Sequence, residues 1–364
     1  MATIVPPRPR PTARTGEAID AEAVDGPAGE HRDRAGALPR SIATLLHATA
    51  ALVWAGAFTF YLRVWLGPRE SDGSIGRSVR EVVGGTADAP FQYRILVPQL
   101  LDRLHDALGW PYGYGEMVVD LVALAVAVAV TAALLRRLGL EVWVLAVALV
   151  GAQLTIGAMW WGKTETYAAL AAATVGLWAV LSDDRRRWLP LLGAAAVLAG
   201  TRTDLLLALG IAALARWALA GRERRDLGAG AGLVAAGLAA TVALKLAYPA
   251  AAYDEAAGML QVQHNLQPLT LLIVLAFLLP TLGPYLLVRS QPTLRAAIAE
   301  HRRWMVPTLA LVAAEVGSVL VVGRADEVRL FLPIAPALGI VGVVGWRALL
   351  GPHLAREWAA SHRG

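Results

Sequence analysis

A succession of long apolar runs constrains this chain more than any other feature. Between about residues 42 and 350, each run approaches the roughly 20 residues with which an α-helix crosses a bilayer, and polar connections separate the runs. Only 17% of the residues are charged, against about a quarter in soluble domains, and the mean hydropathy is +0.53. These properties exclude a water-soluble globule. We expect an all-α polytopic bundle of membrane-spanning helices.

The runs predict about ten spans. They lie at 42–66, 117–135, 142–160, 165–181, 188–201, 204–220, 228–247, 268–288, 305–323 and 330–350. Arg202 and Asp204 interrupt the fifth and sixth, so this part is either two short crossings or one broken hairpin. Residues 41–350 would form the membrane domain, flanked by tails at 1–40 and 351–364. The first tail is rich in Pro, Gly and charge and has no apolar run, which is typical of disorder.

The positive charges predict the orientation in the membrane, because Lys and Arg gather in loops that stay in the cytoplasm. If the first tail lies in the cytoplasm, roughly two thirds of the 33 Lys and Arg residues fall on that side, including the run Arg185–Arg187. We therefore expect a multi-pass protein of the cell (plasma) membrane with both termini in the cytoplasm.

The sequence also excludes several kinds of chemistry. The chain has no Cys, so it holds no disulfide, thiol nucleophile or zinc knuckle. It lacks a Gly-x-Ser-x-Gly elbow and a Gly-rich phosphate loop, which argues against a serine hydrolase and a nucleotide site. Its basic residues lie between apolar runs instead of along one stripe, so we expect no nucleic-acid partner. His264 has no second His at metal-ligand spacing, so we predict no metal site and no cofactor and leave a divalent-metal requirement open.

The connection 67–116 is the longest polar stretch between spans, and long loops are usually functional. It contains two amphipathic segments, Ser74–Val83 and Val97–Leu108, of the kind that lies in the membrane interface. Between them runs a charged and aromatic stretch that extends from Asp88 to Pro98. We predict a large first extracytoplasmic loop with two interfacial helices.

Further polar residues lie at the outer ends of the other spans. Charges so close to hydrocarbon are costly unless they pair or line a polar cavity. They are therefore either helix caps and salt bridges or the walls of one shared cavity. In the second case, the candidate substrate-binding residues are Tyr93, Arg94, Trp161, Lys163, Glu165, Arg202, Asp204, His264, Asn265, Arg324, Glu327 and Arg329.

Glu315 lies near the middle of the ninth predicted span. One interpretation is a protonated or hydrogen-bonded carboxyl that packs against Gln153 or Thr155 on a neighbouring helix. The other is a proton or cation relay, since ionisable groups inside membranes often mark transport pathways.

The stretch Pro90-Phe91-Gln92-Tyr93-Arg94-Ile95-Leu96-Val97-Pro98 is similar to one in a group of uncharacterised bacterial multispan proteins. Members of this group tend to share later Arg-acid and Glu-x-x-Arg elements; the corresponding stretches here are Thr201–Asp204 and Glu327–Pro333, and in the second only one residue separates Glu327 from Arg329. The architecture of residues 42–350, with its large first outer loop, resembles the GT-C fold of integral membrane glycosyltransferases.

This resemblance implies sugar transfer on the outer face, from a polyprenyl-phosphate donor to an unidentified lipid, glycan or protein acceptor. Such a reaction needs a carboxylate to deprotonate the acceptor and cations to hold the departing phosphate. The candidate bases are Asp88, Asp72 and Glu70. The last two occupy the position after the first span where the family usually has its base, whereas Asp88 has the more ordered neighbourhood. The resemblance implies that the phosphate is held by Arg94, Arg202, Arg324 and Arg329.

Two other functions fit the same sequence. A transporter or lipid flippase would use Glu315 as a coupling carboxylate, although such folds usually show broken helices in both halves and only 201–204 is interrupted here. A non-catalytic membrane scaffold would tolerate changes of the outer arginines with little effect beyond stability.

Overall fold

A computed structural model describes residues 75–140, 164–220, 223–251, 260–288, 292–325 and 327–361. Within these ranges the chain forms helices joined by short turns and contains no strand. In this part, five helices are long and apolar enough to cross a membrane: Tyr112–Arg137, Arg224–Ala247, Pro268–Leu287, Leu294–Val321 and Arg329–Leu349. Two shorter helices, Glu165–Leu181 and Trp188–Thr201, are also apolar. The protein is therefore a helical membrane protein, and its described part is all-helical.

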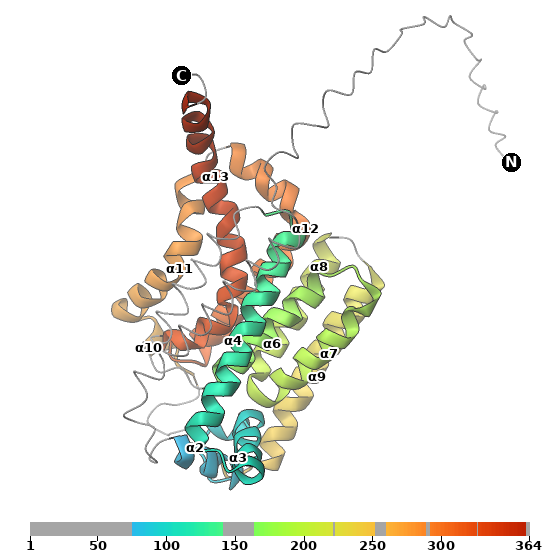
Figure 1. The fold of residues 1–364 in the computed structure, drawn as a ribbon, viewed down its shortest axis with the longest axis vertical. Helices are drawn as coiled ribbons and strands as arrows, with labels where there is room; N and C mark the ends of the chain where they lie inside the picture. Colours follow the sequence, from blue (N-terminus) through green and yellow to red (C-terminus); the bar gives the residue numbers. More distant parts are fainter. Residues whose placement is uncertain are drawn as a thin grey trace, which may run out of the picture. The chain divides into compact units, whose positions relative to one another are not determined.

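The helices and 3₁₀ turns of the described part follow a simple order along the chain (Figure 1). They are α2 (Ile75–Val83), η2 (Phe91–Tyr93), α3 (Leu96–Leu108), α4 (Tyr112–Arg137), α6 (Thr164–Leu181), η3 (Arg185–Arg187), α7 (Trp188–Thr201), α8 (Thr203–Ala220), α9 (Arg224–Ala247), α10 (Val262–Asn265), α11 (Pro268–Val288), α12 (Pro292–Val321), η4 (Val328–Ile334) and α13 (Ala335–Ser361).

The sequence pattern places most of these helices correctly and their ends less well. The two amphipathic segments form α2 and α3, and the fifth predicted span has the bounds of α7. However, α4 begins before residue 117, α12 begins well before residue 305, and α13 continues past residue 350. Each extension adds polar or charged turns, which a search for apolar runs leaves out although a helix accommodates them.

Several predictions lie outside the described residues. These are the tail 1–40, the spans 42–66 and 142–160, the candidate residues Glu70, Asp72, Trp161 and Lys163, and the two proposed neighbours of Glu315, Gln153 and Thr155.

The helices differ in how deeply they are enclosed. Helix α13 packs against α11 and α12. In the span Arg329–Leu349, which includes the first part of α13, 83% of the most apolar stretch is buried, whereas only 22% of the corresponding stretch of α9 is buried. Helix α6 contacts α4 and α7, and α8 contacts α9 and α12. Fully buried residues such as Leu177, Leu205 and Leu338 form the common core. The exposed apolar faces of outer helices are those expected to meet lipid.

Glycine allows α8 and α9 to pack closely. A Cβ atom on Gly230 would lie 2.6 Å from Cγ of Leu214, and one on Gly237 would lie 2.8 Å from Cδ2 of Leu207. Any larger residue would push the helices apart, and such small residues are typical of packed membrane helices. This contact fixes the position of α9 relative to the α7–α8 junction.

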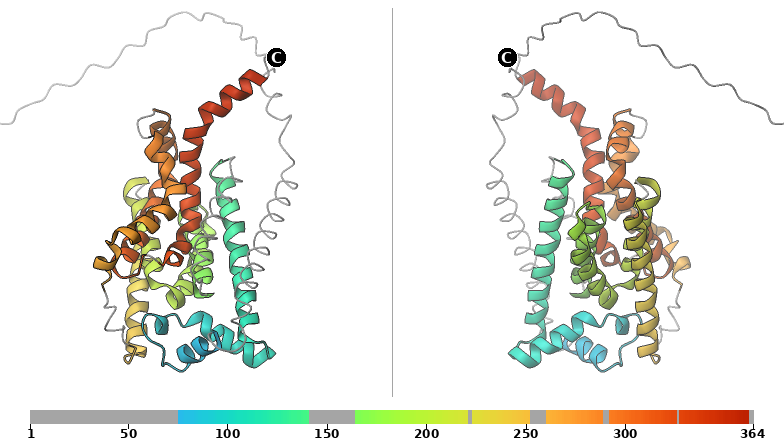
Figure 2. Two further views of the ribbon diagram at one scale, coloured as in Figure 1. Left: turned by 90° about the vertical axis from the view of Figure 1, so that its left-hand side faces the viewer. Right: turned by 90° about the vertical axis from the view of Figure 1, so that its right-hand side faces the viewer.

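The connections of the bundle gather at two ends (Figures 1 and 2). Helices α2 and α3 lie across one end, beside the beginning of α4 and the end of α9. At this end Tyr93 donates to the carbonyl of Ala251, and the amide of Gln261 donates to the carbonyl of Val321. The turns α6–α7 and α8–α9 are joined by ion pairs to each other and to α12 at the other end. All described connections that the sequence assigns to the outer face thus lie at the end with α2 and α3.

Candidate functional site

A buried glutamine organises the loop between α2 and α3. Gln92 is fully buried; its Nε2 donates to the carbonyl of Val82 at 2.9 Å, and its Oε1 accepts from the amide of Ala87 at 2.9 Å. Its backbone amide also donates to the carbonyl of Asp88. The loop therefore closes on itself around one side chain, and this holds the following residues, Tyr93 and Arg94, in place.

Arg94 connects this loop to the bundle. Its Nη1 donates to Oε1 of Glu165 at 3.0 Å, and both side chains are mostly buried, with exposures of 14% and 12%. Glu165 lies in the first turn of α6, where the partial positive charge of the helix end stabilises a carboxylate. The guanidinium carbon also lies 5.4 Å from the centre of the Phe91 ring. The loop and α6 are thus joined by a charge pair.

A second pair lies at the break between α7 and α8. Arg202 ends α7 in an extended conformation, and its amide donates to the carbonyl of Leu198. Its Nε and Nη2 donate to the carboxylate of Asp204, the latter at 2.6 Å, and Nη2 also donates to Oε1 of Glu315 at 2.5 Å. The two predicted spans are therefore separate helices that meet at a buried arginine.

Glu315 thus has a partner that the sequence did not suggest. It is completely buried in α12, and among the described residues its side-chain partner is Arg202. Its second oxygen, Oε2, accepts no hydrogen bond from the described residues. Because Arg202 contacts both Glu315 and Asp204, Glu315 belongs to the same group of charges as the residues at the outer helix ends.

The two pairs influence each other electrostatically. The charge of Arg94 acts on Asp204, and the charge of Glu165 acts on Arg202. Asp204, at 32%, is the most exposed side chain of the two pairs. The arrangement places two guanidinium groups and three carboxylates at one end of the bundle, with Asp204 facing outward.

Arg329 and Glu327 form a third pair, which joins the chain between α12 and α13. Nη2 of Arg329 donates to Oε2 of Glu327 at 2.5 Å, and the two side chains are 13% and 34% exposed. Neighbouring Arg324 is exposed. Of the two interpretations that the sequence leaves open, salt bridges or the walls of a shared cavity, this pair is a salt bridge between residues separated by only one position along the chain.

Asn265 serves the backbone of α12. Its Nδ2 donates to the carbonyls of Val319, Leu320 and Gly323, and its Oδ1 accepts from the amide of Ala325. These bonds satisfy carbonyls that the end of a helix leaves without partners. The residue is 1% exposed, so its geometry supports a structural role instead of the substrate contact that we predicted.

The remaining predicted residues are placed as follows. Asp88 is exposed, and its carboxylate contacts no arginine within the described residues. Tyr93 uses its hydroxyl on the carbonyl of Ala251 at 3.3 Å. His264 is half-buried in α10. Four of the twelve predicted binding residues, Arg94, Glu165, Arg202 and Asp204, therefore come together, and Glu315 joins them through Arg202.

Asp120 is a polar residue that the sequence analysis missed. It is 6% exposed within α4, its Oδ1 accepts no hydrogen bond from the described residues, and the charges of Glu116 and Glu165 act on it. The signal was available, since Asp120 interrupts an apolar run one turn after Glu116. Because the predicted span begins at residue 117, it includes Asp120, and the sequence prediction did not treat this carboxylate as a separate polar group.

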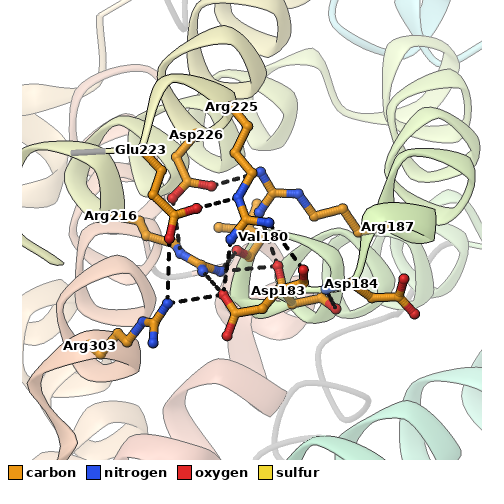
Figure 3. A network of polar contacts seen from close by, with 10 residues as sticks. Val180, Asp183, Asp184, Arg187, Arg216, Glu223, Arg225, Asp226 and Arg303 are labelled. Atoms are coloured by element: carbon orange, nitrogen blue, oxygen red, sulfur yellow. Dashed lines mark hydrogen bonds and ion pairs between the residues drawn. The ribbon is translucent and has the colours of Figure 1, made fainter. Parts of the chain in front are cut away.

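A second network, which the sequence analysis also missed, occupies the other end of the bundle (Figure 3). Nη2 of Arg187 donates to Oδ1 of Asp226 at 2.7 Å, and Nε of Arg216 lies 3.2 Å from Oδ2 of the same carboxylate. All three side chains are buried. Arg216 also contacts Oδ1 of Asp183 at 2.5 Å and donates to the carbonyl of Val180. The network joins the α6–α7 turn to the end of α8 and to the beginning of α9.

Burial tends to raise the pKa of Asp183, yet the hydrogen bond and charge of Arg216, together with the charges of Arg303 and Arg137, hold that pKa below the ordinary value of an aspartate. The carboxylate is therefore ionised at neutral pH and anchors arginines from three helices. Arg225 and Arg303 approach its Oδ1 at 3.4 and 3.1 Å.

Comparisons with known proteins do not assign a function to this arrangement of residues. No protein-family model matches the chain, and neither a curated protein nor a solved structure matches it. Within the described residues no three His, Asp or Glu side chains lie together in a way that could hold a metal ion. The function must therefore be inferred from the site itself.

Proposed function

We propose that the protein is an extracytoplasmic membrane glycosyltransferase of the GT-C type, which moves a sugar from a polyprenyl-phosphate donor to an acceptor. One observation carries the proposal. Arg94, from the loop between two amphipathic helices, meets Glu165 beside the Arg202–Asp204 pair. Charged groups thus gather where the bundle meets its outer loop, which is where a lipid-linked phosphate would enter. In this proposal the bundle has about ten spans and both termini lie in the cytoplasm.

Both arginines keep donors that a phosphate could use. Arg94 contacts Glu165 through Nη1 only, and Arg202 contacts its carboxylates through Nε and Nη2. An arginine carries five N–H donors, so each guanidinium can bind a phosphate oxygen without giving up its carboxylate. Together they would offset the negative charge that develops on the phosphate as the sugar leaves.

The base of the proposed reaction is Asp88. Its carboxylate is exposed and contacts no arginine of the described part, so it can accept a proton from an acceptor hydroxyl. Asp204 is also accessible, but its contact with Arg202 lowers its tendency to take up a proton. Asp72 and Glu70 remain alternatives. The proposal requires no metal, since the arginines supply the positive charge.

The test is the affinity for polyprenyl phosphate of the purified protein in mild detergent, measured by native mass spectrometry. Changing Arg94→Ala removes a charged hydrogen bond, and we expect affinity to fall about 10- to 100-fold. Arg103→Ala is the matched control, because it removes an exposed arginine from α3 at the same end. Equal affinity in wild type and Arg94→Ala, or an equal loss in the control, would contradict the proposal.

A transporter is the second candidate, favoured by the complete burial of Glu315 and by its unsatisfied Oε2. Such a carboxylate could carry a proton through the membrane. In liposomes that contain a pH-sensitive dye, proton entry driven by an imposed potential should occur with the wild type and stop in Glu315→Gln. Proton entry that is the same in both, or absent from both, would remove this alternative. If the protein is a non-catalytic scaffold, the Arg94 variant should not change the binding of polyprenyl phosphate and the Glu315 variant should not change proton entry.

A further inference from the structure

The network at the end opposite α2 and α3 has a buried part and an exposed part. In the buried part Arg187 and Arg216 share both oxygens of Asp226, so these charges satisfy one another. The exposed part consists of Arg225 and Arg303, whose side chains are 35% and 59% exposed. The exposed part can therefore bind a further ligand, whereas the charges of the buried part already satisfy one another.

Together with nearby Arg137, the network carries a small excess of positive charge. Arg225 and Arg303 both approach Oδ1 of Asp183, which is already bound to Arg216, and both also contact Glu223. The four arginines of this network face the four carboxylates of Asp183, Asp184, Glu223 and Asp226, and Arg137 adds a fifth positive charge that acts on Asp183. Figure 3 shows Arg303 approaching this carboxylate from the left and Arg225 from above. Two guanidinium groups that converge on one shared oxygen leave donors for another anion.

The surface next to this network is apolar. Leu189 and Leu192 of α7 are 76% and 63% exposed, and Leu227, two residues after Arg225, is 38% exposed. Trp188 is also exposed, and the guanidinium carbon of Arg187 lies 5.6 Å from the centre of its ring. Exposed tryptophan beside arginine is typical of the level at which a span leaves the hydrocarbon. The arginines therefore lie at the height of lipid headgroups.

We propose that Arg225 and Arg303 bind the phosphate of an anionic phospholipid headgroup in the adjacent leaflet, while the acyl chains lie against exposed apolar residues of α7 and α9. The arrangement offers both halves of a lipid: paired guanidinium groups suit phosphate oxygens, and the neighbouring leucines suit hydrocarbon. A bound phosphate would offset the excess charge of the arginines and hold the α8–α9 turn against α12.

The low pKa of Asp183 supports this assignment. Burial by itself would raise the pKa, but the hydrogen bond and charge of Arg216, together with the charges of Arg303 and Arg137, outweigh it, so the arginines create a positive field at this carboxylate. An anion placed among them experiences the same field. Because Asp183 stays ionised, it keeps Arg225 and Arg303 oriented in the absence of lipid, which makes the site preorganised.

The experiment titrates the full-length protein in mild detergent with dioleoyl phosphatidylglycerol and, separately, with dioleoyl phosphatidylcholine. Native mass spectrometry gives both affinities. We expect the wild type to prefer phosphatidylglycerol, and the double change Arg225→Gln with Arg303→Gln to weaken that lipid about 10- to 30-fold. Binding of phosphatidylcholine should stay the same.

The matched control changes Arg295→Gln and Arg302→Gln. It removes the same charge from α12, and both residues are exposed and lie outside the network. We expect wild-type affinity in this control. An equal loss in the control, or wild-type affinity in the Arg225 and Arg303 double variant, would overturn the proposal. If the double variant does not fold, Arg303→Gln alone decides the question, with an expected loss of about 5-fold.

A third measurement distinguishes a lipid from a soluble anion. Inorganic phosphate is added to the wild-type complex with phosphatidylglycerol at the same concentration as the lipid. We expect the lipid to stay bound, since the acyl chains contribute to its affinity. Displacement by phosphate would assign the site to a soluble anion and would overturn the lipid part of the proposal.

Discussion

The two ends of the bundle use the same residue types for different purposes. At the α6–α7 and α8–α9 turns, Asp226 is buried; its Oδ1 accepts a hydrogen bond from buried Arg187, and its Oδ2 forms an ion pair with buried Arg216. At the end with α2 and α3, Glu315 and Asp120 are just as buried, yet each has an oxygen without a hydrogen bond from the described residues. Satisfied buried charges hold a fold together, whereas unsatisfied ones are costly and usually mark a site that binds something.

The largest effect should come from breaking the satisfied end. Changing Asp226→Asn leaves Arg187 and Arg216 buried without their shared carboxylate, and such a loss typically costs about 3–5 kcal/mol. We expect a lower midpoint in thermal unfolding followed by tryptophan fluorescence. The control is Glu300→Gln, an exposed position on α12, which should change stability by less than about 0.5 kcal/mol.

Equal stability of Asp226→Asn and wild type would mean that the network is not a structural element. The comparison would then lose its basis, because both ends would consist of charges whose pairing has no consequence for folding.

The sequence predicts the class of fold because each apolar run must become a helix, and most helices lie where the runs are. It also predicts that charged residues gather at the helix ends and leaves open whether they form salt bridges or line a cavity; the structure shows Arg202 paired with Asp204. It does not predict that Arg202 reaches Glu315, since the two lie far apart in sequence and only the packing of α8 against α12 brings them together. The Asp226 network was missed for the same reason: its members lie in separate turns that the sequence assigned only to a basic face.

At the other end the expected effect is intermediate. Arg202→Gln removes the partner of buried Glu315 but leaves Asp204 partly hydrated, so we expect a loss of about 2–3 kcal/mol. Glu315→Gln in the same chain removes the buried charge that was left without a partner. The double variant should therefore be more stable than the sum of the single changes predicts, by about 0.5–3 kcal/mol.

This comparison is a double-mutant cycle measured by thermal unfolding in one detergent. Additive changes would show that the 2.5 Å contact between Arg202 and Glu315 contributes nothing, and that the two ends differ less than their geometry suggests.

A smaller effect should follow from loosening the loop that positions Arg94. Gln92→Ala removes the hydrogen bonds to Val82 and to Ala87, each worth about 1 kcal/mol. Hydrogen exchange of residues 84–95 should become faster, and affinity for polyprenyl phosphate should fall although Arg94 is intact. Gln99→Ala on α3 is the control and should change neither property. Faster exchange with unchanged affinity would show that Arg94 does not need the loop for its role.

The smallest effect concerns the pH dependence of the satisfied end. The pKa of Asp183 in the folded protein lies below the ordinary 3.8, chiefly because Arg216 outweighs burial, so its contribution to stability is present above that value and is lost as the pH falls below it. Between pH 7 and pH 3, the unfolding midpoint of Asp183→Asn should therefore fall less than that of wild type, and the two proteins should differ most at pH 7. Asp183 is 49% exposed, so solvent screens its ion pairs and the difference should be small. Parallel midpoints over the whole range would mean that Asp183 has the same pKa folded and unfolded, and that the positive field attributed to its arginines is weaker than their geometry implies.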